Sequence, residues 1–79
     1  MAFEGINFPV YRKYNNGKSY FKIISRNEFE EIQIVGSKKI LHLVKATQLP
    51  EMNHVYDLVY NKDISVAIEE DEYNALKKA

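Results

Sequence analysis

The stretch FPVYRKYNNGKSYFKII, residues 8–24, carries the strongest local structural signal in the sequence. Aromatic and β-branched residues, which favour strands, lie on both sides of residues 15–18, Asn-Asn-Gly-Lys. An Asn-Gly pair accepts the positive φ angles of tight hairpin turns. The sequence therefore predicts a β-hairpin over residues 8–24. Pro9 should lie at the start of the first strand or on an edge, because proline cannot donate to a ladder.

The next segment, SRNEFEEIQIVG at residues 25–36, has two interpretations. Three β-branched residues near its end favour a strand. Its two ends favour a helix, because Ser25 followed by Glu28 matches a capping box and Gly36 suits the left-handed residue after a helix. We predict a short helix over residues 26–35.

Residues 38–47 predict a strand with apolar side chains on both of its faces. Leu41 and Leu43 alternate with Ile40 and Val44, so each face contains two large aliphatic residues. A strand of this kind needs cover on both sides. We therefore expect it to be a central strand.

The remaining elements are a helix over residues 50–61, a strand over 64–68 and a terminal helix over 69–79. Proline in the first turn and an apolar stripe at helical spacing indicate the first of these helices. Acidic residues at the start and lysines at the end indicate the last. The predicted order is β-β-α-β-α-β-α, a mostly antiparallel four-stranded sheet packed with two or three short helices. This is one α+β domain over residues 1–79.

Composition is typical of a small globular protein. The chain has 79 residues, 46% of them hydrophobic. This hydrophobic content is enough for a single core, and the chain is too short for a second domain. Cysteine is absent, which favours a reducing compartment. No signal peptide or membrane span is recognisable. We expect a cytoplasmic protein without a membrane partner.

Charge is unevenly distributed although its formal sum is zero. Residues 1–26 hold five Lys or Arg and one acid, whereas residues 50–79 hold seven acids and three Lys. The two ends of the chain are therefore complementary. Either the two ends lie near each other in the fold, or they are simply solvated, or the basic end is a face that binds a partner.

The sequence contains no recognisable catalytic, metal-binding or phosphate-binding motif. With no thiol, a metal site would have to use His42, His54 and nearby carboxylates such as Asp57, which lack recognisable ligand spacing. The three glycines form no phosphate-binding loop, and the hydroxyl residues lie in turn, cap or strand contexts. We expect no catalytic residue, no metal site and no cofactor, and hence a protein that is not an enzyme.

Protein association is the function we favour. Short helices cannot readily cover both faces of the sheet, yet apolar residues are present on both. The alternative is that the helices divide between the two faces and leave a monomer with no notable exposed surface. Exposed apolar patches usually mark partner sites, and a twofold contact needs only one self-complementary patch. The hypothesis is a small protein-interaction or regulatory module that binds a protein partner, most simply itself as a homodimer, through an apolar sheet face.

Weak nucleic-acid binding is the alternative hypothesis. The predicted hairpin interleaves cations with aromatic rings, as single-stranded nucleic-acid binders do, although the neutral chain with a pI near 6.7 lacks their usual basic balance. The candidate contact residues, for nucleic acid or another partner, are Arg12, Lys13, Tyr14, Lys18, Tyr20 and Lys22.

Overall fold

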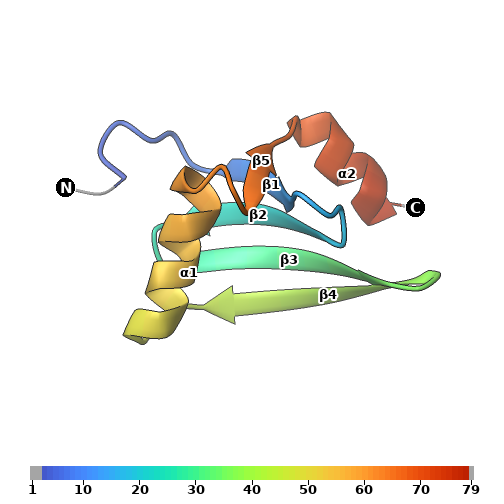
Figure 1. Cartoon of the computed structure of the whole chain (residues 1–79), viewed down its shortest axis with the longest axis horizontal. Helices are drawn as coiled ribbons and strands as arrows, with labels where there is room; N and C mark the ends of the chain where they lie inside the picture. The colour runs from blue at the N-terminus through green and yellow to red at the C-terminus, as the bar shows by residue number, and fades with distance from the viewer. Residues whose placement is uncertain (1–2, 79) are drawn as a thin grey trace.

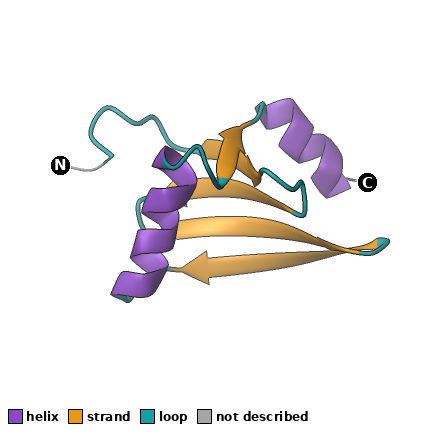
Figure 2. Ribbon diagram, viewed as in Figure 1, coloured by secondary structure: helices purple, strands orange, loops and turns teal. Residues whose placement is uncertain are grey.

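The computed structural model describes residues 3–78 as one antiparallel sheet of five strands with two helices (Figures 1 and 2). The strands lie side by side in the order β4-β3-β2-β1-β5. In chain order the strands are β1 (Val10–Tyr14), β2 (Ser19–Ser25), β3 (Glu28–Val35), β4 (Lys38–Lys45) and β5 (Ser65–Ala67). The helices are α1 (Leu49–Tyr60), between β4 and β5, and α2 (Glu70–Lys78), after β5.

The predicted α+β class and the N-terminal hairpin are confirmed. β1 and β2 pair antiparallel with Lys13 opposite Tyr20, and residues 15–18 form the loop between them. Gly17 has a φ of 72°, which is the left-handed conformation that the Asn-Gly signal predicted. The Asn16 side chain accepts a hydrogen bond from the backbone N–H of Lys18 and closes the loop.

The later elements are also confirmed within a residue or two. The helix predicted over 50–61 is α1, the strand predicted over 64–68 is β5, and the terminal helix is α2. Ala79, the last residue of the predicted terminal helix, lies outside the described residues.

The helix predicted over residues 26–35 is wrong, because this segment is β3. Ser25 does not cap a helix but stabilises a turn, in which its hydroxyl contacts Asn27. Gly36, with a φ of 63°, does not end a helix but begins the two-residue turn between Val35 and Lys38. The sheet therefore has five strands instead of four, and the order is β-β-β-β-α-β-α.

The central position predicted for the strand at residues 38–47 is also wrong. Within residues 3–78, β4 pairs with β3 on one side only and forms one edge of the sheet. Apolar residues on both faces of this strand are therefore not evidence of burial. Seven of its eight residues are exposed, and Val44 is half-buried.

The two helices lie on opposite faces of the sheet. Successive strand residues point to opposite faces, so Phe29 and Glu30 on β3 face different layers. The Phe29 ring meets His54 of α1 edge-on, with ring centroids 5.6 Å apart, whereas Glu30 bonds side chains of α2. The core on the α1 side is made of Phe21, Ile23, Phe29, Ala46, Val55 and Leu58.

A buried carboxylate holds α2 against the sheet. Glu30 is 8% exposed, and its Oε1 accepts hydrogen bonds from the Tyr73 hydroxyl at 2.6 Å and the Lys77 ammonium at 2.9 Å. Burial alone would raise the pKa of Glu30, but the hydrogen bonds from Tyr73 and Lys77, with the nearby charges of Lys77 and Lys22, bring its pKa below the ordinary value. Tyr73 is fully buried and also packs on the Tyr11 ring.

Neither helix of residues 3–78 is long and apolar enough to cross a membrane.

Removing the Tyr73 hydroxyl should destabilise the fold. We expect Tyr73→Phe to lower the free energy of unfolding by about 1–3 kcal/mol, because the buried Glu30 carboxylate loses a donor. Urea unfolding followed by circular dichroism measures this change. Tyr56→Phe removes the same atom from an exposed tyrosine and is the matched control. Equal stabilities of the two variants would contradict the assigned role of the hydroxyl.

Glu30 should also make stability depend on pH. Its folded pKa lies below the reference value of 4.5, so ionised Glu30 stabilises the fold above that pH. This contribution is lost as the pH falls through the folded pKa. We expect the stability difference between the native chain and Glu30→Gln to shrink between about pH 6 and about pH 3. A difference that stays constant over this range, in urea unfolding at each pH, would show that Glu30 does not titrate as proposed.

Candidate interaction surface

The outer edge of β4 is the most exposed part of the sheet. Among residues 3–78 no strand pairs with this edge. Leu43 is 74% exposed, Leu41 51% and Ile40 42%, and we call these three residues the β4 patch. Leu41 and Leu43 lie on the α2 face of the strand and Ile40 on the α1 face, because strand residues alternate. The patch therefore wraps around a free strand edge.

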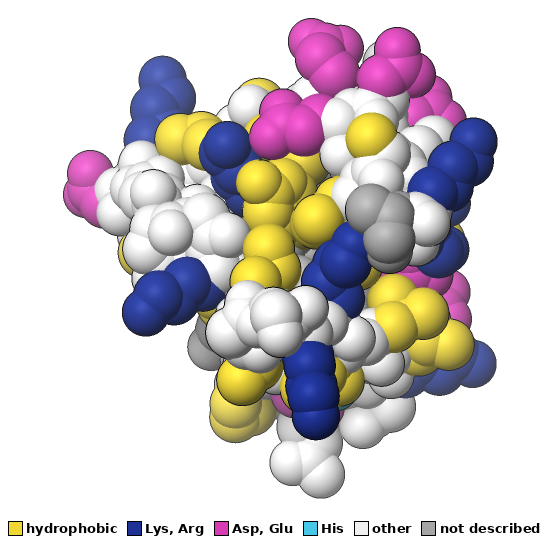
Figure 3. Space-filling model, turned by 90° about the vertical axis from the view of Figure 1, so that its right-hand side faces the viewer, with side chains coloured by type: hydrophobic (Ala, Val, Ile, Leu, Met, Phe, Trp, Pro, Cys, Tyr) yellow, Lys and Arg dark blue, Asp and Glu magenta, His cyan; other side chains and the backbone are white. Residues whose placement is uncertain are grey.

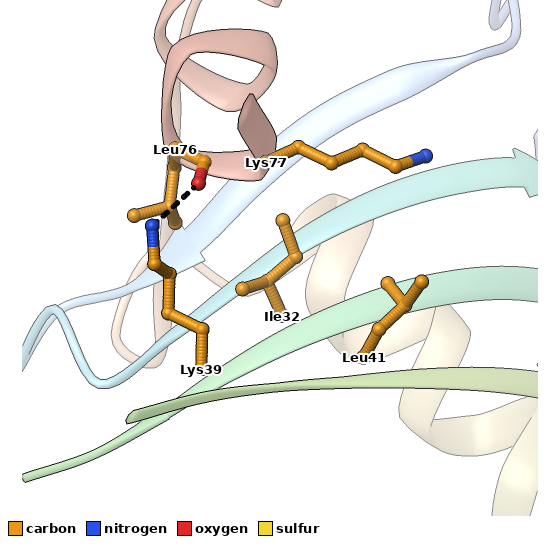
Figure 4. Close-up of a pocket in the computed structure, with 5 residues that line it drawn as sticks. All are labelled: Ile32, Lys39, Leu41, Leu76 and Lys77. Atoms are coloured by element: carbon orange, nitrogen blue, oxygen red, sulfur yellow. Dashed lines mark hydrogen bonds between the residues drawn. The ribbon is translucent and has the colours of Figure 1, made fainter. Parts of the chain in front are cut away.

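Two shallow hollows adjoin the β4 patch. One, of about 310 Å³, lies between the sheet and the last turn of α2, lined by Ile32, Lys39, Leu41, Leu76 and Lys77 (Figure 4). Lys39 donates from its ammonium to the Leu76 carbonyl at 2.9 Å across this hollow. The other, of about 470 Å³, is lined by Ile24, Glu28, Phe29, Leu43, Val44 and Lys45. One hollow therefore adjoins Leu41 and the other adjoins Leu43, so that apolar surface extends beyond the β4 patch on both sides.

The surface around this region combines apolar groups with cations. Figure 3 views the end of the molecule where α2 and the β3–β4 turn lie. Hydrophobic side chains reach the surface there between lysine and arginine side chains, and acidic side chains gather along the upper edge. On β4 itself, Lys38, Lys39 and Lys45 stand at the two ends of the strand, and the five residues between them carry no formal charge with histidine neutral.

The six residues predicted to contact nucleic acid or another partner do not share one face. Lys13, Tyr20 and Lys22 lie on the α2 side of the first hairpin, since Lys13 is opposite Tyr20 in the ladder. Arg12 and Tyr14 point to the α1 side. Lys18 is exposed in the loop between the strands.

Arg12 and Tyr14 are engaged inside the fold. The Arg12 guanidinium donates to the carbonyl of Leu58 at 2.9 Å, and to the hydroxyl and carbonyl of Ser65. Burial lowers the pKa of Arg12. The Tyr14 hydroxyl bonds the His54 ring at 2.9 Å, and its pKa is raised by burial and by the Glu31 carboxylate. Both side chains join β1 to the segment from α1 to β5.

Acidic groups of α2 lie against the other half of the predicted site. Lys13 is 3.4 Å from the Glu72 carboxylate and also stands over the Tyr20 ring. Burial and the charge of Glu70 raise the pKa of Tyr11, on the same face. The acidic end of the chain therefore folds back on the basic hairpin, as the first interpretation of the charge pattern expected.

The β4 patch was missed as a site at the sequence level, although its residues were noted. Apolar residues on both faces indicated a buried strand, but the lysines at its two ends are typical of an edge strand. That signal favours an edge strand, but only the strand order places β4 at the edge of the sheet.

Within residues 3–78, no three His, Cys, Asp or Glu side chains gather closely enough to hold a metal ion. Comparison with protein-family models, curated proteins and solved structures found no match for this chain.

Arg12 should matter for folding. We expect Arg12→Ala to lower the free energy of unfolding by roughly 2–4 kcal/mol, since Leu58 and Ser65 lose a charged donor and the stem of the side chain is lost. Lys18→Ala removes an exposed cation from the same hairpin and should change stability by less than about 0.5 kcal/mol. Chemical denaturation of both variants tests this, and an Arg12→Ala variant as stable as Lys18→Ala would contradict it.

Proposed function

We propose that this protein is a small non-catalytic interaction module whose partner is a second copy of itself, bound through the β4 patch. The supporting observation is the exposure of Leu43 and Leu41 on a strand edge that no strand of residues 3–78 covers. Contiguous exposed apolar groups of this kind usually mark association sites.

A second copy is the occupant that the patch fits best. A contact about a twofold axis needs one self-complementary surface, and an apolar patch on a strand edge meets its own copy without an unpaired charge at its centre. The uncharged residues in the middle of β4 satisfy this condition.

Nucleic-acid binding through the first hairpin stays a prediction, with weaker support. Arg12 and Tyr14 are engaged on the α1 side, and Glu72 pairs with Lys13. Phosphate contacts would weaken steeply with salt. Solution mass measured at two salt concentrations, before and after nuclease treatment, separates the two functions.

The proposed association should depend on Leu43. We expect the native chain to form a dimer by sedimentation velocity, and Leu43→Lys to weaken it by at least about a hundredfold, because one leucine from each copy is no longer buried. Lysine at this position lies opposite Glu30 in the ladder, so the strand itself should tolerate the change.

Leu49→Lys is the matched control, since Leu49 is 70% exposed but lies at the start of α1, outside the β4 patch. We expect this variant to dimerise like the native chain. A native chain that remains monomeric throughout the micromolar to millimolar range, or a dimer equally insensitive to both substitutions, would overturn the proposed function.

A further inference from the structure

We infer that two copies join edge to edge, with β4 of each copy pairing antiparallel so that the two sheets become one, centred on His42. This inference rests on the proposed self-association and adds how the second copy is held. It predicts a specific register of one β4 against the other.

The backbone of β4 offers its outer hydrogen-bonding groups at alternate residues. Ala46, just beyond β4, donates its N–H to the carbonyl of Asn27, so it is directed toward the β3 side. Because groups alternate along an antiparallel strand, the even-numbered residues of β4 also face β3 and the odd-numbered ones face outward. On β3 the Ile34 N–H is bonded to Lys18 on the β2 side, as the same alternation requires.

The outward-facing residues are symmetric about His42. They are Lys39, Leu41, Leu43 and Lys45. A twofold axis perpendicular to the sheet at His42 places each of them opposite another: Leu41 opposite Leu43 of the second copy, and Lys39 opposite Lys45. All four then exchange both of their backbone hydrogen bonds with the second strand.

Side chains support the same register. Leu41 and Leu43 of both copies come together on the α2 face, where directly opposed side chains pack against each other. On the α1 face, Ile40 lies opposite Val44 of the second copy. A register centred on Leu41 would instead place each Lys39 opposite a Leu43 and would leave Lys45 beyond the end of the paired strands.

Lysines on edge strands commonly discourage such pairing. Here they stand at the ends of β4, where Lys39 would meet Lys45 of the second copy, although Glu28 lies directly opposite Lys45 on β3 and offsets part of its charge. Salt screens this repulsion. The edge-to-edge dimer should therefore tighten as salt is added, in contrast to a complex held by phosphate contacts.

Disulfide cross-linking tests the register directly, because the chain has no cysteine of its own. In the inferred dimer the two His42 residues form a non-hydrogen-bonded pair, with Cα atoms about 4.5 Å apart, which is within the range of a disulfide. We expect His42→Cys to form a covalent dimer on mild oxidation. Ile40→Cys, on the same face, should not, because its two copies would lie about 14 Å apart.

Proline substitution tests the backbone pairing. Lys45→Pro removes an outward N–H and should weaken the dimer about tenfold or more. Lys45→Ala keeps the N–H and removes one repelling charge, so it should dimerise at least as tightly as the native chain. Circular dichroism of the two variants checks that β4 remains folded.

The outcomes separate the two proposals. Cross-linking of His42→Cys with weakening by Lys45→Pro supports the edge-to-edge dimer. A dimer that depends on Leu43 but neither cross-links at His42 nor responds to Lys45→Pro overturns this inference and leaves the proposed function standing. A chain that remains monomeric overturns both.

Discussion

Two short helices must cover a five-stranded sheet, and this limit on coverage determines what the rest of the molecule can do. α1 has 12 residues and α2 has nine, so they are only about 18 and 14 Å long. A five-stranded sheet is about 19 Å wide, and the strands of the β3–β4 hairpin have eight residues each. α1 lies across one end of the strands (Figure 1). On the other face α2 packs on the inner strands, where Tyr73 contacts Tyr11 and Glu30. The part of the β3–β4 hairpin next to its turn is therefore left exposed.

The inner strands present different kinds of side chain to the two helices. Toward α1 they present aromatic and aliphatic groups, such as Phe21 and Phe29. Toward α2 they present the Glu30 carboxylate, which Tyr73 and Lys77 bind through hydrogen bonds. A polar anchor of this kind fixes the position of a short helix that buries only one residue of its own. On β4, Val44 packs against the α1-side core, whereas Ile40, Leu41 and Leu43 remain at the surface.

The sequence predicted most of the elements correctly because their signals are local. Asn-Gly at residues 16–17 indicated the first hairpin, and proline with an apolar stripe indicated α1. β3 was predicted wrongly because Ser25 and Gly36 suit a turn as well as a helix end. Pairing with strands on both sides decides in favour of a strand, and a local pattern does not contain that information.

For the candidate site, too, local sequence patterns were not sufficient, because the position of each strand in the sheet decides which residues are exposed. The composition of the first hairpin suggested six contact residues, but the alternation of β1 sends Arg12 and Tyr14 to one face and Lys13 to the other. The β4 patch could not be located from composition, because identical apolar residues would be buried in a central strand. Only the strand order places them at an edge.

Amide hydrogen exchange along β4, followed by NMR at several protein concentrations, tests the central claim most directly. Self-association through the edge predicts that the outward N–H groups of Leu41 and Leu43 become protected as concentration rises, while those of His42 and Val44, bonded toward β3, are protected throughout. Fast exchange at Leu41 and Leu43 at concentrations where the chain is dimeric would contradict pairing through β4.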